Sequence, residues 1–285
     1  MPQVAPENPY GYVPDDAICI MFIVLFAISS TTHLGQAFWK RTWFMIPTVV
    51  LSGCLEILGW SARLWSSKNI LLSEPFSIQI STLIIGPTPL LAADFIIFGR
   101  LVGILGTQYS RLSPRLYARI FLTCDIISLV LQGIGGGWAS SASNNGGDID
   151  PGTNLMIAGI VFQLIVIVVF ATLAAEFAYR FFNDSPFAKH SASANNRGDL
   201  SGKRKLALGG IAFTIVVLAI RAIYRVIELS QGWRSKLMHT QWLFGLFDSA
   251  MVILAFYCWN AFHPGWTVVP DTQYFNKEFS RSGSA

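Results

Sequence analysis

Apolar runs long enough to cross a lipid bilayer alternate with short polar segments along most of this chain. A helix needs about 20 predominantly apolar residues to span the hydrocarbon core of a membrane. Seven runs reach that length, near residues 17–36, 44–63, 76–103, 117–138, 154–180, 206–229 and 240–261. The pattern predicts an all-α integral membrane protein, a seven-transmembrane helix bundle spanning residues 17–261.

The third apolar run differs from the others in its length and its prolines. It contains Pro87 and Pro89 near its middle. Proline lacks a backbone N–H and clashes with the preceding helical turn, so we expect a kink there.

The segments outside the apolar runs suggest how the chain is divided. Residues 1–16 are polar, and Asp15 and Asp16 precede the first run where a signal peptide would carry positive charge. We therefore expect no cleavable signal, and the first run to remain a span. The Ser/Ala/Asn-rich stretch 183–202 has the composition of a flexible linker, and residues 262–285 form a tail.

Basic residues are distributed unequally between the two sides that seven spans define. Connections 1, 3 and 5 and the tail hold thirteen, against three (Lys68, Arg234 and Lys236) on the other side. Cytoplasmic segments of membrane proteins carry the excess of Lys and Arg, so we expect an extracellular N-terminus and a cytoplasmic linker and tail. The thirteen are Lys40, Arg41, Arg111, Arg115, Arg119, Arg180, Lys189, Arg197, Lys203, Arg204, Lys205, Lys277 and Arg281.

Composition agrees with a membrane protein and argues against several other classes. The chain is 53% hydrophobic and only 13% charged, whereas soluble domains have about 25% charged residues. The net charge of +4 is too small to indicate a nucleic-acid partner. The four cysteines lie in different apolar runs without a CxxC pair, and no Walker, GxSxG or HExxH motif is present. We expect no metal, no cofactor and no enzymatic activity.

Charged residues inside the apolar runs are the strongest functional signal. A charge at bilayer depth costs at least about 2.5 kcal/mol, so it normally faces a partner or a water-filled cavity. Two runs repeat the spacing i, i+3, i+4, i+7, which places four residues on one helical stripe. We expect both stripes to face the interior: Glu56, Gly59, Trp60 and Arg63 in the second run, and Arg221, Tyr224, Arg225 and Glu228 in the sixth.

Helical rise sorts these charges into two expected clusters at different depths. The outer cluster consists of Glu56, Arg63, Arg221, Arg225 and Asp248, and the inner cluster of Asp94, Arg100 and Asp125. Stacked polar sites suit a translocation path, and they also suit a receptor with a ligand pocket. Pairs that only hold helices in register are a further alternative. Asp94 has the least obvious basic partner, which makes it the expected proton carrier.

The fourth run adds a polar face without a balancing charge. Asp125, Ser128 and Gln132 share that face, and a glycine-rich stretch follows at residues 133–137. Small residues let helices approach closely, so we expect these glycines to serve packing. Gln132 and Gln163 are candidates either for interhelical hydrogen bonds or for substrate contacts.

Several motifs occur together in one order along the chain. They are Glu56-x-x-Gly59-Trp60-x-x-Arg63, Gly99-Arg100, Phe121-x-x-x-Asp125-x-x-Ser128-x-x-x-Gln132-x-x-Gly135, Gly159-x-x-x-Gln163 and Arg221-x-x-Tyr224-Arg225-x-x-Glu228. In this combination the chain resembles the fungal lipid-translocating exporter family, the RTA-like proteins named for resistance to aminocholesterol. The resemblance implies a seven-span fungal protein of the plasma membrane or an internal membrane. Its relatives are linked to release of sphingoid long-chain bases, resistance to sterol-like amphiphiles and, in one branch, porphyrin transport.

Two positions depart from the pattern of that family. Thr240-Gln241 follow His239 where a Glu is expected, and Asp94-Phe95 stand where a small residue and a Tyr are more frequent. The substrate of the better-known relatives therefore does not transfer directly.

These observations lead to one hypothesis and its alternatives. We expect a translocase or exporter of amphiphilic lipids, sphingoid-base-like or sterol-amine-like, that is not driven by ATP and resides in the plasma membrane or, alternatively, an internal membrane. The alternatives are a seven-helix sensor of lipid state, a porphyrin or drug transporter, and a structural membrane protein. The expected binding or path residues are Glu56, Arg63, Asp94, Asp125, Gln132, Gln163, Arg221, Tyr224, Arg225, Glu228 and Asp248.

Overall fold

The computed structural model describes residues 8, 10–187, 198–232 and 235–268. Within these residues the regular structure is helical, and seven helical stretches are long and apolar enough to cross a membrane. The protein is thus an integral, multi-pass membrane protein of the expected fold class. Its seven stretches are Asp16–Lys40, Trp43–Lys68, Ser73–Leu105, Pro114–Ser143, Asp150–Phe182, Gly202–Ser230 and Gln241–Thr267.

Four stretches are single helices, and local sequence explains where some of them begin and end. They are α1 (Asp16–Lys40), α5 (Pro114–Asn144), α6 (Asp150–Phe182) and α7 (Gly202–Ser230). The Asp15 side chain caps α1 by accepting hydrogen bonds from the backbone N–H groups of Ala17 and Ile18. Arg41 ends α1 in the left-handed conformation, with φ of 53°.

The predicted kink in the third span is confirmed as a break between α3 (Ser73–Ile85) and α4 (Pro87–Leu105). Pro87 has no N–H to donate to the carbonyl of Leu83, four residues earlier. Next to it, the Gly86 carbonyl accepts a 2.6 Å hydrogen bond from the Ser52 hydroxyl on the second span. The second span thus contacts the backbone at the break through a side-chain hydrogen bond.

The second and seventh spans each contain a π-helical segment that the apolar pattern did not predict. The second comprises a 3-10 turn (Trp43–Met45), a π segment (Ile46–Val50) and α2 (Leu51–Lys68). The seventh comprises α8 (Gln241–Phe244), a π segment (Gly245–Ala250), α9 (Met251–Ala261) and α10 (Pro264–Thr267). Single π turns within helices are frequent at functional sites, and Asp248 lies in the second of these.

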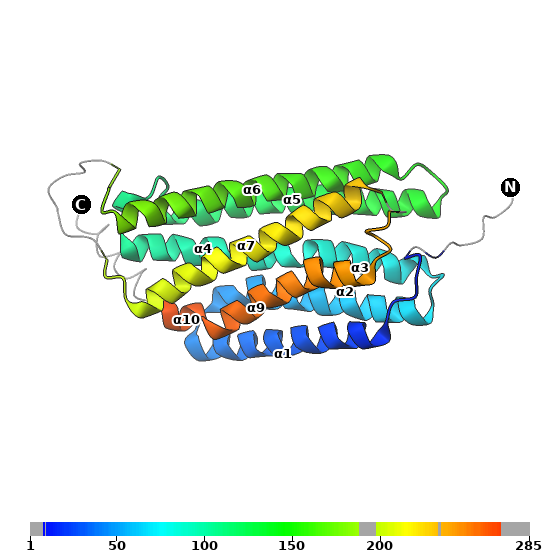
Figure 1. Cartoon of the computed structure of the whole chain (residues 1–285), viewed down its shortest axis with the longest axis horizontal. Coiled ribbons are helices and arrows are strands. Elements are labelled where there is room, and N and C mark those ends of the chain that lie inside the picture. Colours follow the sequence, from blue (N-terminus) through cyan, green and yellow to red (C-terminus); the bar gives the residue numbers. More distant parts are fainter. Residues whose placement is uncertain (1–7, 9, 188–197, 233–234, 269–285) are drawn as a thin grey trace.

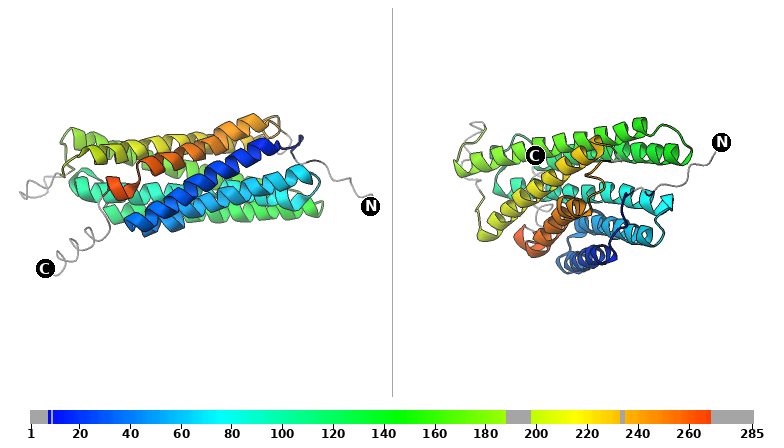
Figure 2. Two further views of the ribbon diagram at one scale, coloured as in Figure 1. Left: turned by 90° about the horizontal axis from the view of Figure 1, so that it is seen from below. Right: turned by 45° about the vertical axis from the view of Figure 1, so that its right-hand side comes forward.

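The helices run along the longest axis of the molecule, with α4 near the centre (Figure 1). In an apolar stretch of 18 residues within the third span, 72% of the residues are buried, against 28–50% in the corresponding stretches of the other spans. The pair α5 and α6 covers one side of α4, and α7 crosses obliquely towards α9 (Figure 1). Helix α1 packs on α2 and α9 at the opposite edge (Figure 2).

The two ends of the bundle are named here by the first and last residues of α1. The Asp16 end carries the segment before α1, and the Lys40 end carries α10 (Figure 1). The segment that we interpret as the linker begins after Phe182 and ends before Gly202. Residues 188–197 of the linker and 269–285 of the tail lie outside the described residues. Which end faces the cytoplasm stays a prediction from the basic residues.

Candidate substrate-binding site

The two predicted stripes face the interior and meet in one place. Five ionisable side chains from α2, α7 and the π segment of the seventh span form what we call the charged cluster: Glu56, Arg221, Arg225, Glu228 and Asp248. Arg221 is 5% exposed and the other four are fully buried. Ionised groups at such burial need partners, and the partners differ sharply among the three carboxylates.

Arg225 organises two of the carboxylates. Its Nε and Nη2 donate to the two oxygens of Asp248 at 2.7 and 2.9 Å, a bidentate pair, and its Nη1 donates to Glu228 at 2.8 Å. The Tyr224 hydroxyl donates to the other oxygen of Glu228 at 3.0 Å. Both oxygens of Asp248 and both oxygens of Glu228 therefore accept hydrogen bonds within the protein.

Arg221 links the charged cluster to the break in the third span. Its Nε lies 3.0 Å from Asp248 Oδ1, and its Nη2 donates to the Leu83 carbonyl. Leu83 is the residue whose carbonyl loses its helical donor because Pro87 has no N–H. Pro87 thus leaves the Leu83 carbonyl available as an acceptor for the Arg221 guanidinium.

Glu56 is the carboxylate without hydrogen bonds. Neither of its buried oxygens has a partner among the described residues. It packs against the break, since a Cβ added to Gly86 would lie 2.7 Å from its Oε1, and it lies within electrostatic range of Asp248, Arg221 and Arg225. Arg221 and Arg225 thus form ion pairs with Asp248, and neither arginine donates a hydrogen bond to Glu56.

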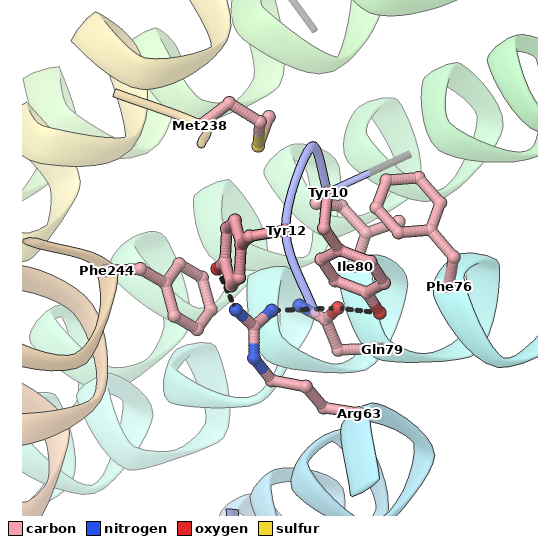
Figure 3. Close-up of a pocket in the computed structure, with 8 residues that line it drawn as sticks. All are labelled: Tyr10, Tyr12, Arg63, Phe76, Gln79, Ile80, Met238 and Phe244. Carbon is pink, nitrogen blue, oxygen red and sulfur yellow. Dashed lines mark hydrogen bonds between the residues drawn. The ribbon is translucent and has the colours of Figure 1, made fainter. Parts of the chain in front are cut away.

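Arg63 does not join the charged cluster, which corrects the predicted outer group. It is 2% exposed, and its guanidinium donates to the Tyr12 hydroxyl and, at 3.2 Å, to Gln79 Oε1 (Figure 3). The centre of the Phe244 ring lies 4.7 Å from the guanidinium carbon of Arg63 and 4.9 Å from that of Arg225, so this ring separates Arg63 from the charged cluster. Arg63 and Glu228 are both buried within the protein, at 2% and 0% exposure.

A small cavity adjoins Arg63 at the Asp16 end. Its volume is about 10 Å³, and Figure 3 shows the residues around it. They are Tyr10, Tyr12, Arg63, Phe76, Gln79, Ile80, Met238 and Phe244. Of these residues, helical spacing in the sequence singled out only Arg63. The others come from the segment before α1, from α3 and from residues 238–244, which lie outside the second span.

The expected inner cluster is not one hydrogen-bonded group. Asp94 accepts a 2.8 Å hydrogen bond from Trp259 Nε1, and its second oxygen has no hydrogen-bond partner among the described residues. Asp125 is 1% exposed, and the described residues offer neither of its oxygens a hydrogen bond. The Arg100 guanidinium lies 4.0 Å from the Phe44 ring centre. Trp259 was not singled out from the sequence, since no spacing relates it to Asp94.

Four uncharged polar residues of the third, fourth and fifth spans form a separate set, which we call the neutral network: Thr88, Ser128, Gln132 and Gln163. Gln163 donates to the Thr88 hydroxyl at 3.0 Å, and Gln132 donates to Gln163 at 3.2 Å and to Ser128 at 2.6 Å. These bonds join α4, α5 and α6. They favour the interhelical alternative for both glutamines.

Glycines allow α5 and α6 to approach as expected. A Cβ added to Gly135 would lie 2.5 Å from the Met156 backbone nitrogen, and one added to Gly152 would lie 2.4 Å from that of Ala139. Side chains at these positions would force the helices apart. Within the glycine-rich stretch, such a close approach occurs at Gly135, whereas a Cβ added to Gly133 or Gly137 would meet open space. The expected packing role is therefore seen at Gly135.

Neither a metal centre nor a disulfide is part of this site. In the described part of the chain, no group of three or more His, Cys, Asp or Glu side chains could hold a metal ion. The four cysteines are free.

Comparison with known proteins agrees with the family resemblance. The chain is 29% identical to the Sphingoid long-chain base transporter RSB1 of Saccharomyces cerevisiae, over 90% of this chain and 73% of that protein. Protein RTM1 of the same organism is 27% identical over 78% of this chain and 69% of its own length, and Protein RTA1 is 26% identical over 86% and 81%. No solved structure matches. The sequence pattern of the family described as RTA1 like protein matches residues 49–270, and the chain belongs to that family.

Proposed function

We propose that the protein is a translocase or exporter of amphiphilic lipids that carry an amine, and that Glu56 receives the amine. The observation that carries this proposal is the contrast within the charged cluster. Asp248 and Glu228 have hydrogen-bond donors, whereas both oxygens of Glu56 have none.

The charge balance of the cluster supports a cationic ligand. Three carboxylates face two guanidinium groups, so the ionised cluster carries one net negative charge. An ammonium group beside Glu56 would neutralise that charge and donate up to three hydrogen bonds. Without a ligand, protonation of a carboxylate would neutralise the cluster equally well.

The relatives support a lipid as the amine carrier. The name of one relative identifies its cargo as sphingoid long-chain bases. Such a base combines one amine headgroup with a long alkyl chain, which matches a buried carboxylate inside a helix bundle surrounded by lipid. A sterol-amine-like compound has the same two features.

Exchange of the amine for a proton is the proposed source of directional movement. The chain has no nucleotide-binding loop, so ATP hydrolysis is not part of the proposal. Asp94 is the proposed proton carrier because it is fully buried and accepts a hydrogen bond from Trp259 Nε1. Asp125, buried without hydrogen bonds, lies on the same proposed path.

Topology and location complete the proposal. The Asp16 end faces the outside, and the linker and the tail lie in the cytoplasm, because the basic residues concentrate on the Lys40 side. The plasma membrane is the proposed location.

The test of the amine site uses purified protein in proteoliposomes and a fluorescent long-chain base. We expect Glu56→Gln to slow transfer across the bilayer at least about tenfold, the size of a lost charge pair. Its thermal unfolding should stay near that of wild type, because Glu56 accepts no hydrogen bond that the amide would lose. Asp125→Asn tests whether the path continues inward.

A matched substrate provides the control. The N-acylated analogue of the same base has no charge, so its transfer should not respond to Glu56→Gln. Equal transfer of the amine by wild type and variant would overturn the amine site. Saturable binding by wild type without any transfer would favour the sensor alternative.

Asp94→Asn tests the proton carrier in the same liposomes. The asparagine side-chain amide does not bind a proton near neutral pH. The transfer rate should therefore no longer depend on an imposed pH gradient. Trp259 can still donate to the amide oxygen, which keeps the helices in register. A pH dependence equal to that of wild type would remove Asp94 from the mechanism.

A further inference from the structure

The guanidinium of Arg63 is buried without a negatively charged partner. Its side chain makes no ion pair within the described ranges, and its Nε has no hydrogen-bond partner. Its other donors meet neutral oxygens, those of Tyr12 and Gln79. A buried charge normally has an opposite charge beside it, because removal from water is costly.

The tyrosines around Arg63 do not supply the missing negative charge. Burial raises the pKa of Tyr10 to about 12 and also raises the pKa of Tyr12. Both phenols are therefore protonated near neutral pH. The Tyr10 and Phe244 rings, with centres 4.9 and 4.7 Å from the guanidinium carbon, attract the cation but leave its charge uncompensated.

The segment that covers Arg63 comes from outside the helices. Tyr10 and Tyr12 precede α1, and Gly11 between them has φ of 68°, a left-handed conformation that glycine adopts readily. The Tyr10 hydroxyl donates to Gln79 Oε1 at 2.8 Å, the same oxygen that accepts from Arg63 (Figure 3). The cavity of about 10 Å³ beneath this cover holds about one water molecule.

We propose that Arg63 binds the phosphate of a phosphorylated amphiphile at the Asp16 end of the bundle, in place of the Tyr12 hydroxyl and the Gln79 side-chain oxygen. A planar guanidinium matches two phosphate oxygens, and here two of its nitrogens already hold two neutral oxygens (Figure 3). The present cavity is too small for a phosphate, so the Tyr10–Tyr12 cover moves aside on binding. The aromatic and aliphatic lining then borders the first part of the alkyl chain.

Charge balance and spacing separate this subsite from Glu56. Glu56 and Arg63 lie seven residues apart on one stripe, about 10 Å along the helix axis. Arg63 lies outside the charged cluster, so an amine at Glu56 and a phosphate at Arg63 would each meet a group of opposite charge. The inference rests on the proposed function for the lipid nature of the ligand, whereas phosphate binding at Arg63 is measured without any transport.

The test measures equilibrium binding of a fluorescent long-chain base 1-phosphate to the full-length protein in neutral detergent. We expect Arg63→Gln to weaken binding at least about tenfold, because a buried charge pair is lost. We expect the unphosphorylated base to bind Arg63→Gln as it binds wild type. Arg111→Gln, which removes an exposed arginine at the other end, is the control.

Gln79→Glu gives a sharper test because it predicts opposite signs for two measurements. The glutamate would place a carboxylate on Arg63 while keeping the acceptor for Tyr10. Thermal stability should therefore rise, and binding of the phosphorylated base should fall at least about tenfold. A merely disrupted site would lower both. Gln79→Met, which adds no charge, should retain binding.

The outcomes separate cleanly. Unchanged affinity of the phosphorylated base in both Arg63→Gln and Gln79→Glu would overturn the proposal, even if Glu56-dependent transfer of the amine were established. Loss of binding in both, with Gln79→Met and Arg111→Gln intact, would support it. Inorganic phosphate is then added as a competitor. Displacement of the lipid would show that the site binds the phosphate group itself, and retention of the lipid would show that binding also requires the alkyl chain.

Discussion

The charged cluster and the neutral network are both buried polar sites in one helix bundle, and they are built differently. In the neutral network, glutamine amides donate to side chains on neighbouring helices, and one acceptor, Gln132 Oε1, has no partner among the described residues. In the charged cluster, two carboxylates have several donors and Glu56 has none. An unpaired neutral acceptor costs a few kcal/mol at most, whereas an unpaired buried charge costs far more. The contrast supports a packing role for the neutral network and the proposed binding of an amine or a proton at Glu56.

The backbone differs between the two regions as well. Ser128, Gln132 and Gln163 of the neutral network lie on the regular helices α5 and α6, which glycines bring together, whereas Thr88 lies on α4 directly after the break. The charged cluster lies beside the Gly86–Pro87 break and within the π segment Gly245–Ala250. Irregular backbone inside a membrane is tolerated where neighbouring groups satisfy it, and Arg221 does so for the Leu83 carbonyl. Both sites thus adjoin the break, and the π segment is the irregular backbone that belongs to the charged cluster alone.

Removing Arg225 should have the largest effect on stability. Arg225→Met leaves Glu228 without its arginine and Asp248 with Arg221 alone, so we expect a loss of about 3–5 kcal/mol. Thermal and denaturant unfolding in detergent, followed by circular dichroism, measures the loss. Arg111→Gln, which breaks an ion pair with a largely exposed arginine, should change the unfolding little. A loss below about 1 kcal/mol for Arg225→Met would show that buried ion pairs do not distinguish the two regions.

Breaking the neutral network should have a smaller effect, and one confined to stability. Gln163→Leu removes the hydrogen bonds with Thr88 and Gln132, at about 1–2 kcal/mol in total. Transfer of the long-chain base should remain at the wild-type rate, in contrast to Glu56→Gln. Thr172→Val, on the exposed face of the same helix, is the control because its hydroxyl donates only within α6. Loss of transfer in a stably folded Gln163→Leu protein would place the neutral network on the substrate path instead.

Much of the architecture was predictable because it follows from local properties of the chain. Apolar length identified all seven spans, and Pro87 predicted the break in the third. The 3.6-residue period assigned both charged stripes to the interior, where Glu56, Arg225 and Glu228 are fully buried. Expected span limits were off by a few residues, since helix ends depend on capping and on contacts beyond the membrane core.

The partners within the site were not predictable in the same way. Depth along each helix grouped Arg63 with Glu56 and Asp94 with Asp125, but depth says nothing about rotation around the bundle. Arg63 instead meets Tyr12 and Gln79. The π segment around Asp248 leaves no mark in an apolar pattern, because it changes one turn of backbone and no side-chain type.

By itself, the sequence determined the membrane-spanning class, the number of spans, the break at Pro87 and the identity of the inward-facing charged residues. These features depend on hydrophobicity and helical period, which are properties of each segment alone. Only the tertiary structure decided that Arg225 pairs with Asp248 on the seventh span, that both Glu56 oxygens lack hydrogen-bond partners among the described residues, and that Tyr10 and Tyr12 cover Arg63. Hydrogen bonds between helices act over about 3 Å and depend on how distant segments rotate and pack against one another.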